Sequence, residues 1–271
     1  MAQHRPPPTP GTAGTGQLPR LPALGDSLRV VRENLNLSRS KAYARHGVSA
    51  SYLFEIEVNG YVPGLETLDK IIDGYRLGPA LARHLRELRA APEDLAPLSK
   101  LHECVTSNAA HLAHLADLEG RGIIAAFVDP LWNILACTDA LRANLPGIDE
   151  TWSVPAWTFS ATARQIIIDW EYEATHSVAT LKSTLGRYRD SEQARTLIHR
   201  LRPNRDFQRL WNTSIDVTHT RDVNDLLHIR DPHTGVPGSC LITVADADQS
   251  HNIQLLTAIN KPYAGPEPSG A

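Results

Sequence analysis

The chain has 271 residues, of which 42% are apolar and 21% are charged. This is the composition of a globular protein that can form one large core or two ordinary ones. The sequence contains no run of about 18 apolar residues and no charged-then-apolar leader, which argues against a membrane-spanning protein and predicts a cytoplasmic location. Cys104, Cys137 and Cys240 lack metal-type spacing, so we expect reduced thiols.

Charge is distributed unevenly along the chain, whose net charge is -3. Residues 1–90 carry twelve Lys or Arg against eight Asp or Glu, whereas residues 91–271 carry fifteen against twenty-two. An excess of basic residues favours contact with nucleic acid, and an excess of acidic residues opposes it. We therefore expect any nucleic-acid contact to come from the first part of the chain.

The N-terminal part begins with residues 1–23, which are rich in proline, glycine and threonine. Such a segment buries too little apolar area to offset its ordering entropy, so a disordered tail is predicted. The first helix follows, with Leu24, Leu28, Val31 and Leu35 at helical spacing.

Residues 37–57 are the most informative stretch and predict two short helices joined by a tight turn. Gly47 can adopt a positive φ, which lets one helix end and the next begin at a steep angle. Ser49 is a natural N-cap, and Leu53 and Ile56 point to a small core with Val48. This geometry suits a helix placed in the major groove of DNA, although an ordinary αα-hairpin is the alternative. The outer side of the second helix carries Ala50, Ser51, Phe54 and Glu55.

Two further helices, beginning near Leu65 and Leu81, complete an expected five-helix unit over residues 24–90. Residues 24–88 resemble the Cro/C1-type helix-turn-helix domain of the XRE-like regulators. The resemblance rests on Gly47-Val48-Ser49, Leu53, Ile56-Glu57, Pro63 and Leu65-Glu66-Thr67-Leu68. It implies binding to double-stranded DNA through Arg39, Lys41, Arg45, Ser49, Ala50, Ser51, Tyr52 and Glu55.

The second of the paired helices contains two glutamates and no lysine or arginine. Most of the affinity for DNA comes from neutralised phosphates, so we expect this affinity to depend on Arg39, Lys41 and Arg45. Glu55 could accept a hydrogen bond from a cytosine amino group.

Residues 91–120 are predicted to be a linker and a connecting helix, the helix running from residue 99 to 119. His111 and His114 could place two imidazoles on one face of it. No third ligand is evident, so we predict no metal site and favour an ordinary solvated helix face.

In residues 121–261 the spacing of apolar residues changes, and short strand-like runs alternate with helical stretches. This predicts an antiparallel sheet with flanking helices. A hairpin turns at Asp129-Pro130 and enters a helix, residues 166–210 are helical with a break near Arg189, and three strand-like runs follow at 226–229, 239–244 and 253–259. The fold class is therefore α+β, with a second disordered tail over residues 262–271.

This second half resembles the ligand-binding domain of the MmyB-like transcription regulators, which is PAS-like. The resemblance rests on Ile168-Asp169-Trp170-Glu171, on Asp206-Phe207-Gln208-Arg209-Leu210-Trp211 and on Asp216-Val217. It implies an apolar small-molecule ligand such as a fatty acyl chain. Its expected lining is Phe127, Leu135, Cys137, Trp170, Leu227 and Leu241, each of which could equally be plain core.

Five arginines cluster in the last predicted helices. They are Arg195, Arg200, Arg202, Arg205 and Arg209. One of them could bind a ligand carboxylate, because guanidinium does so in a bidentate manner. A solvated helix face paired with nearby acids is the alternative.

Catalytic motifs are absent: the sequence has no Gly-x-Ser-x-Gly elbow, no phosphate-binding glycine loop and no His-Glu-x-x-His. The leading hypothesis is a ligand-responsive, homodimeric, DNA-binding transcription regulator without catalytic activity or a required cofactor. The rival is a small-molecule-binding or haem-binding protein, or an enzyme, on a regulator scaffold whose DNA binding has degenerated.

Overall fold

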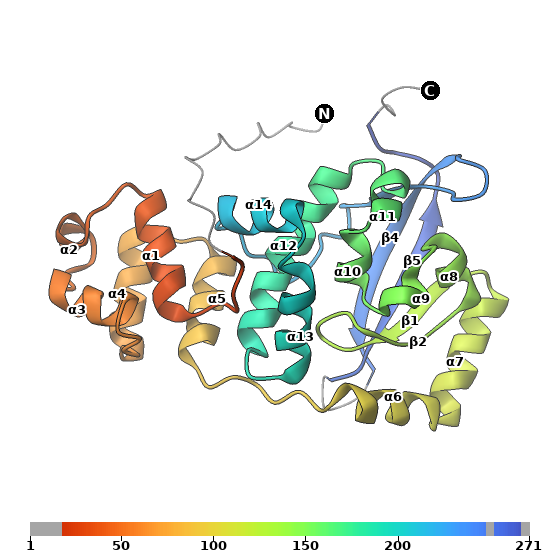
Figure 1. Cartoon of the computed structure of the whole chain (residues 1–271), viewed down its shortest axis with the longest axis horizontal. Helices are drawn as coiled ribbons and strands as arrows, with labels where there is room; N and C mark the ends of the chain where they lie inside the picture. Colours follow the sequence, from red (N-terminus) through yellow and green to blue (C-terminus); the bar gives the residue numbers. More distant parts are fainter. Residues whose placement is uncertain (1–17, 248–251, 267–271) are drawn as a thin grey trace.

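The computed structural model describes residues 18–247 and 252–266. It contains a helical N-terminal region followed by a part with a five-stranded antiparallel sheet and flanking helices, so the predicted α+β class is confirmed. Figure 1 shows α12, α13 and α14 as a helical layer between the N-terminal helices and the sheet.

Five helices form the N-terminal unit, at the positions predicted from the apolar spacing. They are α1 (Leu24–Asn34), α2 (Arg39–His46), α3 (Ala50–Glu57), α4 (Leu65–Tyr75) and α5 (Pro79–Arg89). Their inward stripes meet in one core, in which Leu28, Leu53, Ile56, Leu68 and Leu85 are fully buried. Burial of these stripes, rather than the intrinsic helix propensity of such short segments, holds the helices together.

The predicted connecting helix over 99–119 is wrong in one respect, because it is two helices. These are α6 (Leu98–Thr106) and α7 (Ala109–Gly120). The break lies at Ser107 and Asn108, where the Asn108 side chain accepts hydrogen bonds from the amides of Ala110 and His111 and caps α7. An asparagine that caps a new helix competes with continuation of the old one.

The sheet has the strand order β2-β1-β5-β4-β3, and all of its neighbouring strands are antiparallel. The strands are β1 (Ile124–Val128), β2 (Ile134–Cys137), β3 (Leu227–Arg230), β4 (Pro237–Asp246) and β5 (Gln254–Lys261). The expected hairpin and the three later strands are therefore confirmed. Asp129 makes the first turn, since its carboxylate accepts from the amides of Leu131 and Asn133, each at 2.9 Å.

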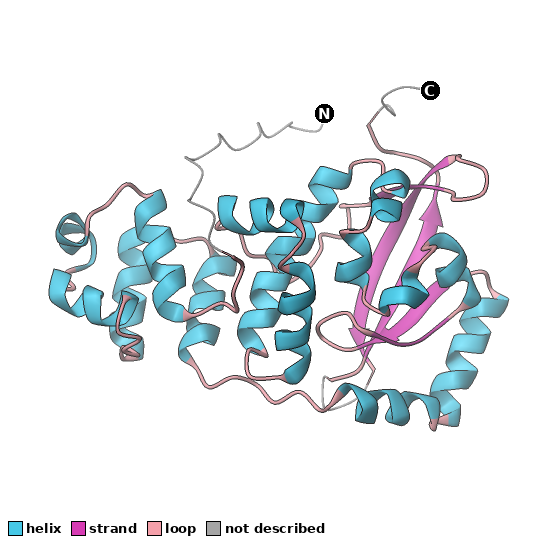
Figure 2. Ribbon diagram, viewed as in Figure 1, coloured by secondary structure: helices cyan, strands magenta, loops and turns pink. Residues whose placement is uncertain are grey.

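The two faces of the sheet are covered differently (Figure 2). One face packs against the helical layer and forms the larger core, while α6 and α7 cover the other face over β2 and β1. The helices after the hairpin are α8 (Asp139–Asn144), α9 (Ile148–Thr151), α10 (Val154–Thr158), α11 (Ala161–Ile166), α12 (Trp170–Arg187), α13 (Glu192–Leu201) and α14 (Arg205–Thr213). The short α9, α10 and α11 were not predicted, because four to six residues show no clear period.

Parts of both predicted tails are ordered, contrary to expectation. Leu21 packs against the larger core, and the Pro19 carbonyl accepts from Arg202 Nε at 3.2 Å. At the other end, the Ala264 amide donates to Ser239 Oγ at 3.0 Å. The rest of the predicted tails, residues 1–17 and 267–271, lies outside the described residues.

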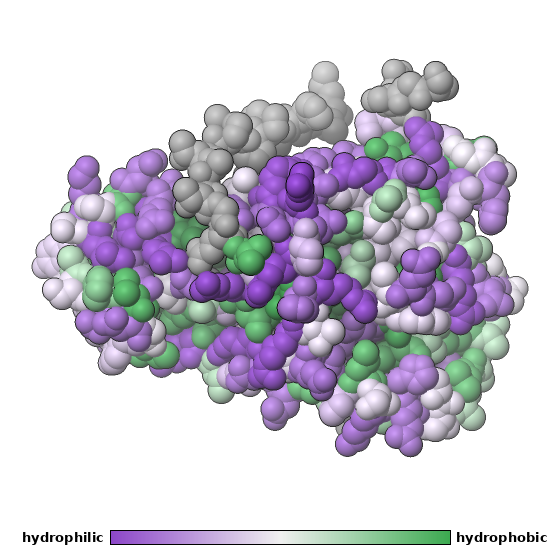
Figure 3. Space-filling view, in the orientation of Figure 1, coloured by the Kyte–Doolittle hydropathy of each residue, from purple (hydrophilic) through white to green (hydrophobic). Residues whose placement is uncertain are grey.

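The surface in Figure 3 mixes hydrophilic residues with small, separate hydrophobic patches. Within residues 18–247 and 252–266, none of the helices combines the length and the apolar character that crossing a membrane requires.

Candidate nucleic-acid interface and ligand-binding site

The turn between α2 and α3 has the conformation expected from its sequence. Gly47 ends α2 in the left-handed region with φ 71°. Ser49 then caps α3, its hydroxyl accepting from the amide of Tyr52 at 3.2 Å. Ser38 caps α2 in the same way, accepting from the amide of Lys41 at 3.1 Å. Two side-chain caps and one glycine thus set the angle between two eight-residue helices.

The inner side of α3 is held close to α1. Leu53 and Ile56 are fully buried, and Val48 is nearly so. A β-carbon on Gly25 would lie 2.3 Å from the carbonyl oxygen of Ile56, so only glycine allows α1 to approach α3 this closely.

Glu57, at the last turn of α3, is internal. Its side chain is 0% exposed, and its two carboxylate oxygens accept from Arg32 Nε at 2.7 Å and Arg32 Nη2 at 2.8 Å. Arg39 Nε donates to the same carboxylate at 2.8 Å. The hydrogen bonds that Arg32 donates to Glu57 raise the pKa of the Arg32 guanidinium above its ordinary value. One carboxylate therefore joins α1, α2 and α3.

This arrangement changes the charge that α3 presents outward. Only one of its two glutamates, Glu55, is exposed, and its Oε2 accepts from Asn59 Nδ2 at 2.8 Å. Among the basic residues predicted to meet DNA, Lys41 and Arg45 are exposed, whereas Arg39 is half-buried and occupied by Glu57. The pairing thus withdraws one acid, Glu57, and one base, Arg39, and leaves Lys41, Arg45 and Glu55 as the outward charges beside α3.

The other predicted contact residues, Ser49 to Tyr52, are consecutive at the start of α3. Ser49 and Ser51 are exposed, while Ala50 and Tyr52 are half-buried. Phe54 joins them as an exposed aromatic ring, with the Arg39 guanidinium 5.2 Å from its centroid. The predicted contact set omitted Phe54, although its outward position on the helix was foreseeable.

The six residues expected to line a ligand cavity are not brought together. Phe127 and Leu135 lie under α6 and α7 on one face of the sheet. Trp170 belongs to the core on the opposite face, against which Cys137 and Leu227 also pack. Leu241 is half-buried on β4.

Leu135 and Cys137 do line a groove with a volume of about 750 Å³, formed by α6, α7, β2 and α8. Its other lining residues are Leu98, Ser99, His102, Thr106, Leu112, Leu115, Ile134, Ala136, Arg142 and Trp152. The walls are mostly apolar, and Arg142 at the rim lies 5.7 Å from the Trp152 ring centroid. Burial raises the pKa of the Cys137 thiol, which is therefore neutral.

A second hollow, of about 790 Å³, lies between α6, the start of α7 and Ile253, which precedes β5. Its lining includes the polar residues Lys100, Ser107, Asn108 and His111, so it suits an apolar ligand less well than the groove. His111 itself stacks against Phe127, with 4.6 Å between ring centroids. Among the residues that the structure describes, no three His, Cys, Asp or Glu converge to hold a metal ion.

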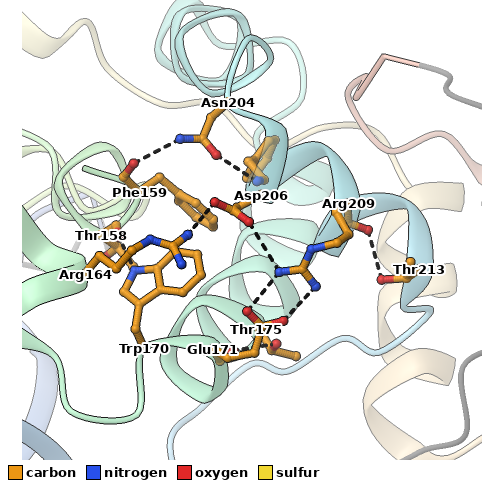
Figure 4. Close-up of polar contacts among 11 residues, drawn as sticks. Thr158, Phe159, Arg164, Trp170, Glu171, Thr175, Asn204, Asp206, Arg209 and Thr213 are labelled. Carbon is orange, nitrogen blue, oxygen red and sulfur yellow. Dashed lines mark hydrogen bonds and ion pairs between the residues drawn. The ribbon is translucent and has the colours of Figure 1, made fainter. Parts of the chain in front are cut away.

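The residues that carry the second resemblance tie α10, α11 and α14 to the start of α12 (Figure 4). Trp170 Nε1 donates to the Thr158 carbonyl at 2.8 Å, and the Arg164 guanidinium lies 3.7 Å from the Trp170 ring centroid. Arg164 in turn pairs with Asp206 on α14. These contacts hold α11 and α14 against the start of α12.

Arg209 belongs to the same cluster. It makes a bidentate pair with Glu171, with distances of 2.7 and 2.8 Å. Arg200 donates to the Thr151 carbonyl at 2.8 Å, and Arg202 contacts Pro19 as described above. These three arginines are thus engaged with the protein itself, which favours the paired-surface interpretation over a ligand carboxylate.

A family profile, that of the MmyB-like transcription regulator ligand binding domain, matches residues 115–259. The chain belongs to this family. The match runs from α7 through β5, and it includes the sheet, the helical layer and part of the groove wall. No curated protein matches the sequence. Membership of the MmyB-like family makes the chain a ligand-responsive regulator, while the matched region does not include α1 to α6.

Proposed function

We propose that this chain is a DNA-binding transcription regulator in which α1 to α5 form a helix-turn-helix domain, and in which an apolar small molecule in the groove controls DNA binding. The observation that carries the proposal is the α2–Gly47–α3 geometry, with Ser49 capping a short, outward-facing helix, in one chain with an MmyB-like ligand-binding domain. A second helix fixed at a steep angle is what major-groove recognition requires.

In this proposal, Lys41 and Arg45 neutralise phosphates, while Ser51, Phe54 and Glu55 face the bases. Arg39, which the sequence also predicted to meet DNA, instead pairs with Glu57 and fixes the start of α2 against α3. Phe54 suits an apolar contact with a thymine methyl group, and Glu55 suits a cytosine amino group. A two-fold dimer would place two copies of α3 on half-sites about one helical turn apart.

The DNA part is tested by fluorescence anisotropy on fragments of the source genome at two salt concentrations. Exchanging both Lys41 and Arg45 for alanine should weaken binding and reduce the slope of log affinity against log salt by about 2, since each phosphate contact contributes about 0.9. Lys70→Ala is the matched control, because Lys70 is an exposed lysine of the same unit that pairs with Glu66 at 2.8 Å. Salt-insensitive binding, or none at all, would refute the proposal.

The ligand part is tested by native mass spectrometry of freshly purified protein, followed by titration with a long-chain fatty acid as the probe. Leu112 lines the groove and is 44% exposed, so Leu112→Lys should make the groove polar without unfolding the chain. We expect at least tenfold weaker probe binding, since burying a lysine charge beside an alkyl chain is unfavourable. Val223→Lys, at a residue 64% exposed elsewhere in the same part of the chain, is the control.

A further inference from the structure

Helix α12 has two neighbours of different kinds. One side of it contributes Ala174, Val178, Leu181 and Leu185 to the core beneath the sheet. Its other side packs against α5, the last helix of the N-terminal unit, and the two lie side by side in Figure 1. A movement of α12 relative to the sheet would therefore act directly on α5.

The contact depends on a glycine in the last turn of α12. A β-carbon on Gly186 would lie 2.7 Å from His84 Cε1 and 2.9 Å from Leu88 Cδ2. His84 and Leu88 are 2% and 5% exposed, so neither side chain has free space to move into. Glycine is unfavourable inside a helix, and here its missing side chain is what admits α5.

Hydrogen bonds from the second part of the chain hold both ends of α5. His219 Nε2 lies 3.1 Å from the Ala80 carbonyl at the start of the helix. At the other end, Arg189 donates to the Ala90 carbonyl at 2.5 Å and to the Gly186 carbonyl at 2.7 Å. A guanidinium at a helix C-terminus satisfies free carbonyls and complements the helix dipole.

The chain segments before and after the N-terminal unit also contact the helical layer of α12, α13 and α14. Before α1, Leu21 and Pro19 contact the core and Arg202, as described above. After α5, the Glu93 amide donates to the Arg187 carbonyl at 2.9 Å, and Gln193 Nε2 donates to the Ala96 carbonyl at 2.6 Å. The segment predicted as a linker is thus docked onto α12 and α13.

We propose that the contact between α5 and α12 fixes the N-terminal unit, α1 to α5, in one orientation on the ligand-binding domain. We call this contact the latch, and it depends on Gly186. A change at the sheet reaches α2 and α3 through α12 and α5, without passing through a flexible tether. This regulatory consequence rests on the proposed function, whereas the latch itself does not.

The test compares the full chain with Gly186→Leu, using Gly120→Leu as the matched control. A β-carbon at Gly120, in the last turn of α7, meets nothing within 4 Å. We expect the wild type and Gly120→Leu to unfold in a single calorimetric transition. Gly186→Leu should split this into two transitions and enlarge the radius of gyration measured by X-ray scattering, with its helical circular dichroism retained. Adding His84→Ala to Gly186→Leu vacates the space and should restore the single transition.

The latch is refuted if Gly186→Leu keeps one transition and the wild-type radius of gyration, or if the wild type already unfolds in two independent transitions. Should Gly186→Leu fail to fold, His219→Ala combined with Arg189→Ala loosens both ends of α5 without inserting any atoms, and the same two outcomes apply. None of these readouts uses DNA, so absence of DNA binding would overturn the proposed function and leave the latch to be judged separately.

Discussion

Replacing Glu57 by alanine should destabilise the N-terminal unit severely. The carboxylate is fully buried and is the shared partner of Arg32 and Arg39, which approach it at 2.7 and 2.8 Å. Without it, the Arg32 guanidinium, whose side chain is only 7% exposed, keeps a buried charge with no comparable partner. The Glu33 carboxylate at 3.2 Å is mostly exposed and cannot take its place.

The size of the effect follows from this burial. Removing one member of a buried ion pair typically costs about 3–5 kcal/mol, because the remaining charge is left desolvated and unpaired. A domain of this kind is stable by only about 5–15 kcal/mol in total. Glu57→Ala should therefore reduce the free energy of unfolding by a large fraction, and the folded population at 37 °C should be visibly smaller.

Urea unfolding followed by far-UV circular dichroism measures this directly. Glu55→Ala is the control, since Glu55 is an exposed residue of the same helix and should cost about 0.5 kcal/mol or less. Combining Glu57→Met with Arg32→Met should recover much of the loss, because it removes both buried charges together. If Glu57→Ala lowers the free energy of unfolding by less than about 1 kcal/mol, and no more than Glu55→Ala does, the ion pairs of Glu57 with Arg32 and Arg39 do not support the fold.

Three further predictions concern stability. Burial lowers the pKa of His84 to about 3, so the unfolded chain, with a histidine pKa of about 6.5, binds a proton that the folded chain excludes. The stabilisation from keeping His84 neutral is therefore present above about pH 6.5 and is lost as the pH falls towards 3. Between pH 7 and pH 5 this lowers the free energy of unfolding by about 2 kcal/mol. His84→Gln should lack this part of the pH dependence in urea unfolding. Gly25→Ala should cost about 1–3 kcal/mol by forcing α1 from α3, whereas Gly64→Ala, where a β-carbon meets nothing within 4 Å, should cost far less in the same assay. Arg209→Ala should lower the melting temperature only slightly, because a pair exposed to this degree is worth about 1 kcal/mol or less.

The sequence by itself determined the features that depend on near neighbours in the chain. A glycine before a Val-Ser pair led to the turn after α2, and Asp129-Pro130 between two β-rich runs led to the first hairpin. Both were predictable, because capping and turn formation involve residues a few positions apart. The same local character explains why the five helices of the N-terminal unit and all five strands were found.

Tertiary structure alone decided which charges face outward and where the two parts meet. The sequence count gave α3 two glutamates, and only the fold shows that one of them, Glu57, is buried against Arg32, 25 residues earlier in the chain. The groove needs Trp152 from an irregular segment beside α6 and α7, which no periodic pattern places together. Nothing in the sequence singled out Gly186, because a glycine within a helix is expected only to weaken it. Its role is apparent only once α5 is seen to occupy the space that a side chain would need. Pairings between distant residues depend on how the elements pack, and a linear pattern holds no direct record of that packing.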